Sequence, residues 1–83
     1  MKLLYFAWLK AKTGLAEEEV TPPDEVTTVA GLLAWLQDRG PNYAEAFADL
    51  DALRVAVNQE YARPVDPVGP DDEVALFPPV TGG

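Results

Sequence analysis

The chain has 83 residues, the size of one small domain, and 48% of them are hydrophobic. Six Lys and Arg residues stand against 14 Asp and Glu, a net charge of −8 that repels nucleic-acid phosphates. Cys and His are both absent, which excludes thiol chemistry and removes the commonest general base and metal ligand. We therefore expect no nucleic-acid partner, no metal site and no catalysis by this chain on its own.

The opening segment predicts a strand over Lys2–Leu9, an apolar run rich in aromatic residues. Its apolar part is too short for a membrane span, Lys10 and Lys12 follow at once, and no small-residue cleavage site appears. We therefore expect a cytoplasmic protein without a membrane partner. Alternation divides the strand's side chains between two faces, with Leu3, Tyr5 and Ala7 on one and Leu4, Phe6 and Trp8 on the other.

The next segments predict a returning strand and two helices. Thr13-Gly14 favours a turn, and Glu17–Thr21 is typical of a strand whose three glutamates are solvated. Pro22-Pro23 ends this strand because proline cannot donate to the ladder. Beyond it, apolar residues at helical spacing predict the main helix, with Thr27 or Thr28 as its cap and Gly40-Pro41 as its end. These positions are Val29, Leu32, Leu33 and Leu36. A second, short helix then begins at Pro41 and places Tyr43, Phe47 and Leu50 on one side.

The last third of the chain predicts three extended segments around a loop. Leu53–Val57 alternates between inward and outward positions, and Asn58–Tyr61 is typical of a turn leading into a short extended piece. Pro64–Asp72 contains three prolines and a glycine, which favours an ordered loop. Glu73–Phe77 is the final strand, with Val74 and Leu76 on one face and Phe77 on the other.

This order of elements predicts an α+β fold in which a mixed sheet packs on one main helix, accompanied by a second short helix. A helical crossover allows the first and last strands to lie side by side and parallel. That arrangement is the ubiquitin-like β-grasp, although a ferredoxin-like or split-barrel fold uses similar elements. We expect one domain over residues 1–79 and a flexible tail over residues 80–83.

The end of the sequence, Phe77-Pro78-Pro79-Val80-Thr81-Gly82-Gly83, is its most informative feature. Pro78-Pro79 ends the strand and directs the chain outward in an extended conformation. The four residues that follow span roughly 13–14 Å when extended. Because Gly82 and Gly83 lack a Cβ, such a tail fits a narrow channel in another protein.

The chain resembles the MoaD family, the sulfur-carrying small subunits of molybdopterin synthase. The resemblance is most specific in 77–83, clear in Asp71–Ala75, and visible in Val55–Gln59 and Lys2–Trp8. The family's fold is the ubiquitin-like β-grasp. In segment 22–52 the match is one of pattern only.

The resemblance implies that an activating enzyme related to those of ubiquitin uses ATP to adenylate the Gly83 carboxylate. A sulfurtransferase then supplies the sulfur of a C-terminal thiocarboxylate, a 1-thioglycine. The large synthase subunit receives this tail, and the sulfur attacks a cyclic pyranopterin monophosphate. The chain itself would bind no cofactor and would not be a catalyst. It would join a heterotetramer of two small and two large subunits.

Three aromatic residues, Phe6, Tyr61 and Phe77, match by resemblance the apolar patch that contacts both the large subunit and the activating enzyme. Alternation also turns Phe77 away from the core side of its strand, although Phe6 or Tyr61 could belong to the core. Trp8 and Trp35 are expected at the edge of the core. Two other functions stay open: a sulfur carrier for thiamine synthesis or tRNA thiolation, and a β-grasp interaction module whose terminus undergoes no chemistry.

Overall fold

The computed structural model describes residues 1–79, so the predictions on Val80, Thr81, Gly82 and Gly83 concern residues outside the described range. Five strands, three α-helices and one 3₁₀ helix make up these residues. In chain order they are β1 (Lys2–Tyr5), α1 (Trp8–Thr13), β2 (Glu17–Glu19), α2 (Val29–Gln37), α3 (Pro41–Ala46), the 3₁₀ helix η1 (Leu50–Ala52), β3 (Arg54–Val57), β4 (Glu60–Ala62) and β5 (Glu73–Phe77).

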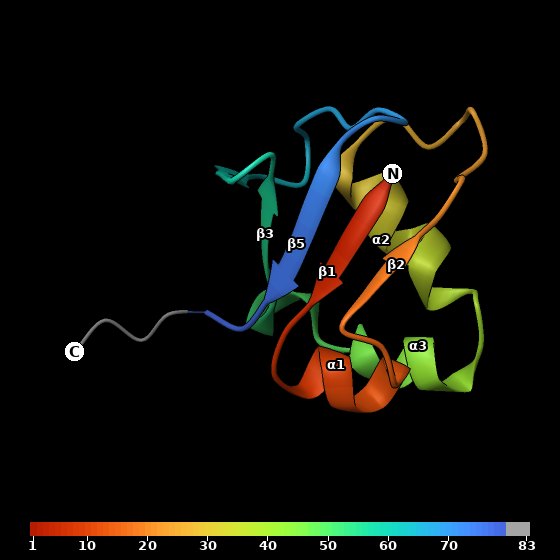
Figure 1. The fold of residues 1–83 in the computed structure, drawn as a ribbon, viewed down its shortest axis with the longest axis vertical. Helices are drawn as coiled ribbons and strands as arrows, with labels where there is room; N and C mark the ends of the chain where they lie inside the picture. The colour runs from red at the N-terminus through yellow and green to blue at the C-terminus, as the bar shows by residue number, and fades with distance from the viewer. Residues whose placement is uncertain (80–83) are drawn as a thin grey trace.

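The strands form one mixed sheet in the order β2-β1-β5-β3-β4. The first and last strands pair in parallel, with Leu3 opposite Val74 and Tyr5 opposite Leu76, and the remaining pairs are antiparallel. Figure 1 shows β1 and β5 side by side near the centre of the sheet, with α2 behind them. This confirms the predicted parallel pairing and the β-grasp order of elements.

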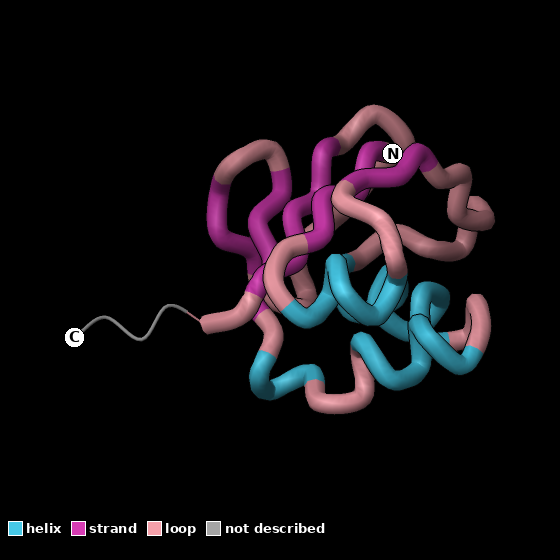
Figure 2. Tube along the Cα trace, turned by 60° about the horizontal axis from the view of Figure 1, so that its bottom comes forward, coloured by secondary structure: helices cyan, strands magenta, loops and turns pink. Residues whose placement is uncertain are grey.

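The helices gather on one face of the sheet (Figure 2) and enclose the core there. Leu3, Val74 and Leu76 from the central strands are completely buried, as are Leu32 and Leu36 of α2. Within residues 1–79, no helix lies over the other face of the sheet (Figure 2). Outward-pointing side chains of the strands therefore remain available to solvent or to another protein.

Local sequence signals explain the ends of α2. The Thr28 hydroxyl accepts a hydrogen bond from the backbone N–H of Gly31 at 3.1 Å, which satisfies one of the free donors at the helix start. Gly40 has a φ of 152° and separates α2 from α3, and Pro41 occupies the first turn of α3. The predicted cap, break and second helix are all confirmed.

The first predicted strand is too long, because β1 ends at Tyr5 and α1 begins at Trp8. Ala7 has φ 55° and ψ −127°, and the N–H of Leu9 donates to the carbonyl of Phe6 at 3.1 Å. These are the features of a type II′ turn, which reverses the chain within four residues. The helix then buries Leu9 and Thr13, four residues apart, against the rest of the core.

Two smaller expectations also fail. Leu50 does not join Tyr43 and Phe47 on one helical side. It lies in η1 and is 42% exposed, because α3 ends at Ala46 and the Asp49 side chain caps the next turn. The second strand ends at Glu19 rather than Thr21.

Trp8 and Trp35 are half-buried against the core, as expected.

Candidate functional site

The outer face of the sheet is mostly apolar along two adjacent rows near its tail end, each with one charged member, Glu17 opposite Leu4 and Arg54 opposite Phe77. Residues opposite one another in a sheet share a face, and register places Leu4 beside Ala75, Ala75 beside Ala56, and Ala56 beside Tyr61. Phe77 begins the next row toward the tail. We call this surface the outer-face patch, consisting of Leu4, Phe6, Ala56, Tyr61, Ala75 and Phe77.

The structure brings two of the three predicted aromatic residues into contact. The rings of Tyr61 and Phe77 pack in a tilted arrangement with centroids 5.9 Å apart. Tyr61 is nevertheless 75% exposed and Phe77 is half-buried. Phe6 lies on the other side of β5, where its N–H donates to the carbonyl of Leu76 at 3.1 Å.

Phe6 is itself 49% exposed, so none of the three aromatic residues belongs to the core. A groove of about 420 Å³ opens beside Phe6 and is lined in part by Leu4 and Lys10. Exposed aromatic residues next to a concave surface are typical of protein interfaces. All three lie near the end of β5, from which the chain continues through Pro78 and Pro79.

The backbone turn at Ala7 fixes where Phe6 lies. Phe6 extends the pairing of β1 with β5 by one residue, and the positive φ of Ala7 then takes the chain away into α1. An alanine at φ 55° is strained relative to glycine. The turn therefore ends the strand pairing at Phe6 and keeps Phe6 beside the end of β5.

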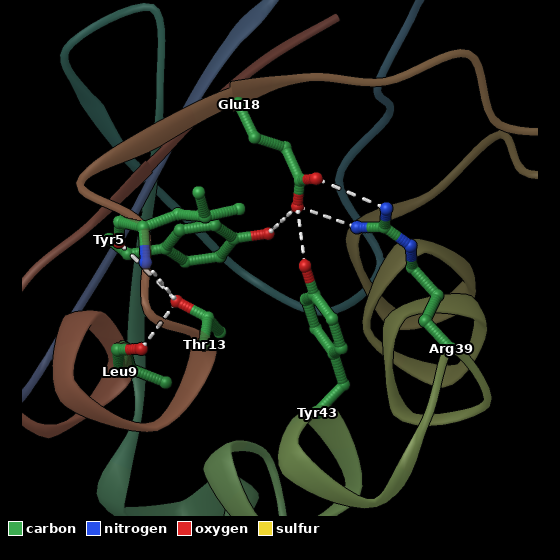
Figure 3. Close-up of polar contacts among 7 residues, drawn as sticks. Tyr5, Leu9, Thr13, Glu18, Arg39 and Tyr43 are labelled. Carbon is green, nitrogen blue, oxygen red and sulfur yellow. Dashed lines mark hydrogen bonds and ion pairs between the residues drawn. The ribbon is translucent and has the colours of Figure 1, made fainter.

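A polar cluster that the sequence did not reveal lies on the helix side of the sheet (Figure 3). Glu18 faces inward beside Leu3, so the expectation that the whole glutamate run is solvated is wrong for this residue. Its Oε1 accepts hydrogen bonds from the hydroxyls of Tyr5 at 2.7 Å and Tyr43 at 3.1 Å. We call Glu18, Tyr5, Tyr43 and Arg39 the Glu18 cluster.

Arg39 completes the cluster with a two-pronged ion pair. Its two terminal nitrogens lie 2.6 Å from Oε1 and 3.1 Å from Oε2 of Glu18. The guanidinium also stacks over the rings of Trp35 and Tyr43, with centroid distances of 5.3 and 4.6 Å. Arg39 thus joins the C-terminal end of α2 to β2.

The cluster changes the titration of its members. Burial would raise the pKa of the Glu18 carboxyl, but hydrogen bonds from its three donors and the charge of Arg39 outweigh burial and hold this pKa below its ordinary value. Burial and the Glu18 carboxylate together raise the pKa of the Tyr5 and Tyr43 hydroxyls. The glutamate therefore stays ionised and both tyrosines stay protonated at neutral pH.

The sequence contains few local signals for the Glu18 cluster, which explains why the cluster was not predicted. Glu17, Glu18 and Glu19 have identical side chains, and only strand alternation separates the middle one from its neighbours. Its strongest partner, Arg39, is 21 residues away in the sequence. Alternation was the one available signal that Glu18 faces the core.

Residues 1–79 contain no group of three or more acidic side chains placed to hold a metal ion. Within the same residues, no helix is long and apolar enough to cross a membrane. The chemistry-bearing residues predicted from the sequence, Gly82 and Gly83, lie beyond the described range. The described part of the site is therefore the outer-face patch and the strand that leads to the tail.

Comparison with known proteins places these observations in a family. A model described as the ThiS family matches residues 3–83. The chain belongs to the ThiS family. It is 36% identical over 83 residues to the molybdopterin synthase sulfur carrier subunit of Escherichia coli, a match that covers all of this chain and 99% of that protein. The human molybdopterin synthase sulfur carrier subunit is 31% identical over 86 residues, a match that covers all of this chain and 93% of that protein.

Solved structures of similar proteins have the same fold. SAMP1 from Haloferax volcanii superposes with a TM-score of 0.74 at 29% identity, covering all of this chain and 98% of that one. A putative molybdopterin converting factor, subunit 1, from Pyrococcus furiosus gives a TM-score of 0.76 at 30% identity over 95% of both chains. The β-grasp fold and the resemblance to the MoaD family are therefore confirmed.

Proposed function

We propose that this protein is the sulfur carrier of molybdopterin synthesis and that the carboxylate of Gly83 carries the sulfur. The observation that supports this most directly is the family match, which runs through residue 83 and so includes the whole Gly-Gly segment. The outer-face patch supports it independently, because exposed aromatic residues surround the strand that leads into that segment.

Loading of the carrier requires two substitutions, the first at the α-phosphorus of ATP and the second at the carbonyl carbon of Gly83. The Gly83 carboxylate attacks the α-phosphorus of ATP in an activating partner, which forms an acyl-adenylate and releases pyrophosphate. A sulfur nucleophile then forms a C–S bond, and the C–O bond to AMP breaks. Hydrosulfide gives the thiocarboxylate directly. A protein persulfide gives an acyl disulfide, which a second thiol cleaves, and that thiol remains in a disulfide with the donor.

Transfer of the sulfur takes place on the large synthase subunit. The thiocarboxylate sulfur forms a C–S bond at an electrophilic carbon of the pyranopterin precursor, and a C–O bond at that carbon breaks with departure of its oxygen. Water then cleaves the resulting thioester and restores the Gly83 carboxylate. Two sulfurs build the dithiolene, so two loaded carriers or two rounds are needed. The catalytic groups belong to the partners, and the assembly contains two small and two large subunits with carriers at its outer ends.

Intact mass measurement tests the proposal. Co-expression with the activating enzyme and a sulfur source should add about 16 Da to the chain, because sulfur replaces one oxygen. Deletion of Gly83, or addition of one residue after it, should abolish loading, since one residue moves the terminus by roughly 3.3–3.6 Å and reacting atoms must approach within about 3–3.5 Å. Gly82→Val should also fail, because a β-branched side chain obstructs a narrow channel.

Thermal melts of the same variants separate chemistry from folding. Loss of Gly83 should leave the melting temperature unchanged, because Gly83 follows the last strand and trimming a chain end usually costs little stability. Full loading and transfer by the Gly83-deleted protein would refute the carrier role. A collapsed melt would show instead that the end of the chain is structural.

A second candidate is a sulfur carrier that serves another pathway. The matching family model is described only as ThiS, which does not distinguish one acceptor from another. Both candidates predict the same mass increase. They differ in the partner, so co-purification of a molybdopterin synthase large subunit supports the first, and loading without any affinity for that subunit supports the second.

A further inference from the structure

Two of the six cationic side chains differ from the other four in their acidic partners. Four of them form an ion pair with a carboxylate: Lys2, Lys12, Arg39 and Arg63. Within residues 1–79, Arg54 and Lys10 form none. In a chain with 14 acidic residues and six basic ones, a cation without a carboxylate partner is the exception. Both exceptions border the outer-face patch.

Arg54 lies on the outer face of the sheet at its tail end. Register pairs it with Phe77, and residues opposite one another in a sheet share a face. The next residue of β3, Val55, is buried in the core, so strand alternation turns the exposed Arg54 the other way. Arg54 therefore borders the patch on the β3 side, one row closer to the tail than Ala56 and Tyr61.

Lys10 borders the same patch on the other side of β5. It lines the groove of about 420 Å³ beside Phe6, and in the strand order β1 and β3 lie on either side of β5. Glu17 also lines this groove, but its carboxylate lies 3.2 Å from the amine of Lys2. The strand that leads to the tail thus lies between two cations, of which Arg54 is the one next to the Tyr61–Phe77 pair.

The backbone holds the guanidinium of Arg54 in place. Its Nη1 donates to the carbonyl oxygens of Asp51 at 3.1 Å and Leu53 at 2.9 Å, whereas the Asp51 carboxylate forms no ion pair with it. The N–H groups on Nε and Nη2 donate to no acceptor within residues 1–79. Because one side of the planar group is already fixed, a further hydrogen bond costs little side-chain entropy.

This arrangement specifies the chemistry of a surface that covers the patch. An apolar centre would contact the rings of Tyr61 and Phe77, and an acidic side chain beside it would accept the unused N–H groups in the geometry that a guanidinium and a carboxylate share. A surface without that acid would remove water from the guanidinium without replacing its hydrogen bonds, which costs free energy.

We propose that Arg54 is a specificity-determining residue of the docking surface and that the large synthase subunit presents a carboxylate to it. This inference rests on the proposed function, which supplies the large subunit as the partner of the outer-face patch. An exposed charge at the border of an interface acts mainly on the rate of association. Arg54 would therefore orient the carrier as it approaches, with β5 and its tail toward the large subunit.

Zero-length cross-linking tests for the carboxylate directly. A carbodiimide joins a lysine amine to a carboxylate in contact with it, with net loss of water. In the complex, Arg54→Lys should become cross-linked to an Asp or Glu of the large subunit, and mass spectrometry of tryptic peptides locates the new amide. Lys12 is an internal control, because its amine already lies near Glu45 of this chain and should give no cross-link to the large subunit.

Association kinetics test the contribution of the charge. Arg54→Glu and Lys12→Glu have the same net charge, so a difference between them reports position alone. We expect Arg54→Glu to associate with the large subunit about tenfold more slowly than Lys12→Glu at low salt. The difference should shrink in about 1 M NaCl, where the screening length falls to about 3 Å. Thermal melts check that all variants fold.

Equal association rates for Arg54→Glu and Lys12→Glu would overturn the inference. A complex of Arg54→Lys that forms but gives no cross-link to the large subunit would also overturn it. So would a cross-link only to a carboxylate of the carrier itself, such as that of Gly83 or of a second copy, because the acceptor would then belong to this chain. If the wild type does not bind the large subunit at all, the proposed function is refuted and this inference with it.

Discussion

The outer-face patch and the Glu18 cluster depart in opposite ways from the usual placement of side chains. The patch exposes aromatic rings, with Tyr61 at 75% and Phe6 at 49%. The cluster partly withdraws a carboxylate and a guanidinium from solvent, since the side chain of Glu18 is only 14% exposed and that of Arg39 is 27% exposed. The two regions meet at the end of β1, where Tyr5 belongs to the cluster and the next residue, Phe6, belongs to the patch.

The two regions differ in whether the chain itself supplies their contacts. Every polar atom of the cluster that is fully buried has a partner among the described residues, so the cluster needs nothing from outside. The patch has no corresponding cover within residues 1–79. An exposed apolar surface costs free energy in water, so the patch is consistent with the proposed contact with another protein, whereas the cluster contributes to folding.

The largest effect should come from breaking the patch. Phe77→Asp should weaken binding to the proposed large subunit by about 2–4 kcal/mol, the scale of a buried aromatic anchor. Titration calorimetry measures the affinity, and a thermal melt checks the fold. Tyr61→Asp provides a second variant with less risk to the core, because Tyr61 is mostly exposed.

Val65→Asp is the matched control for this prediction. Val65 is 71% exposed in the loop before β5 and lies outside the patch, so its replacement should leave the affinity unchanged. If Phe77→Asp and Tyr61→Asp both bind as tightly as the wild type, the patch is not the interface.

The next effect should come from breaking the cluster. Glu18→Ala leaves Arg39 and two tyrosine hydroxyls without their shared acceptor, and we expect the free energy of unfolding to fall by about 2–3 kcal/mol. Urea denaturation measures this loss. Glu17→Ala removes an exposed ion pair with Lys2 and should cost less than about 1 kcal/mol. Equal losses in the two variants would show that burial of Glu18 contributes nothing, and affinity for the partner should change in neither.

Much of the fold could be predicted because local patterns determine it. The helical spacing of the α2 leucines, its Thr28 cap and the alternation of Glu73–Phe77 each specify one element, and the structure has all three. The outward position of Phe77 follows from the same alternation. Its contact with Tyr61 depends on how β3, β4 and β5 pair, which no local pattern specifies.

The failures have a different physical origin. Helix α1 has only six residues, and the aromatic residues around its start favour a strand. The strand ends because Ala7 adopts a positive φ, and alanine gives no sequence signal for that conformation. Glu18 is buried because Arg39 and two tyrosines converge on it from other elements. Both depend on tertiary contacts. The chemistry of Gly82 and Gly83 was inferred from family resemblance, not from packing.

Acid should weaken the cluster selectively. The pKa of Glu18 is held below its ordinary value in the folded protein, so the unfolded chain binds this proton more readily. The contribution of Glu18 to stability is therefore complete above about pH 4.5 and is lost as the pH falls through the lower, folded pKa. Glu18→Gln keeps the shape but cannot titrate. Carboxylates titrate between roughly pH 6 and pH 3, so urea denaturation is measured over this range. The free energy of unfolding should fall less steeply for Glu18→Gln than for the wild type as the pH is lowered, and identical declines would contradict the prediction.

The smallest effect concerns the residue at the junction of the two regions. Ala7 occupies a type II′ turn position that favours glycine, so Ala7→Gly should relieve strain and raise the free energy of unfolding by about 0.5 kcal/mol, or roughly 2–4 °C in Tm. Ala11→Gly is the control, since it places glycine inside α1 and should cost about 0.5–1 kcal/mol. Differential scanning calorimetry measures both changes. Because the turn geometry is kept, Phe6 stays in the patch and partner affinity should not change. A lower Tm for Ala7→Gly would mean that the turn is not strained, and weaker binding would mean that the alanine, rather than the turn itself, holds Phe6 in place.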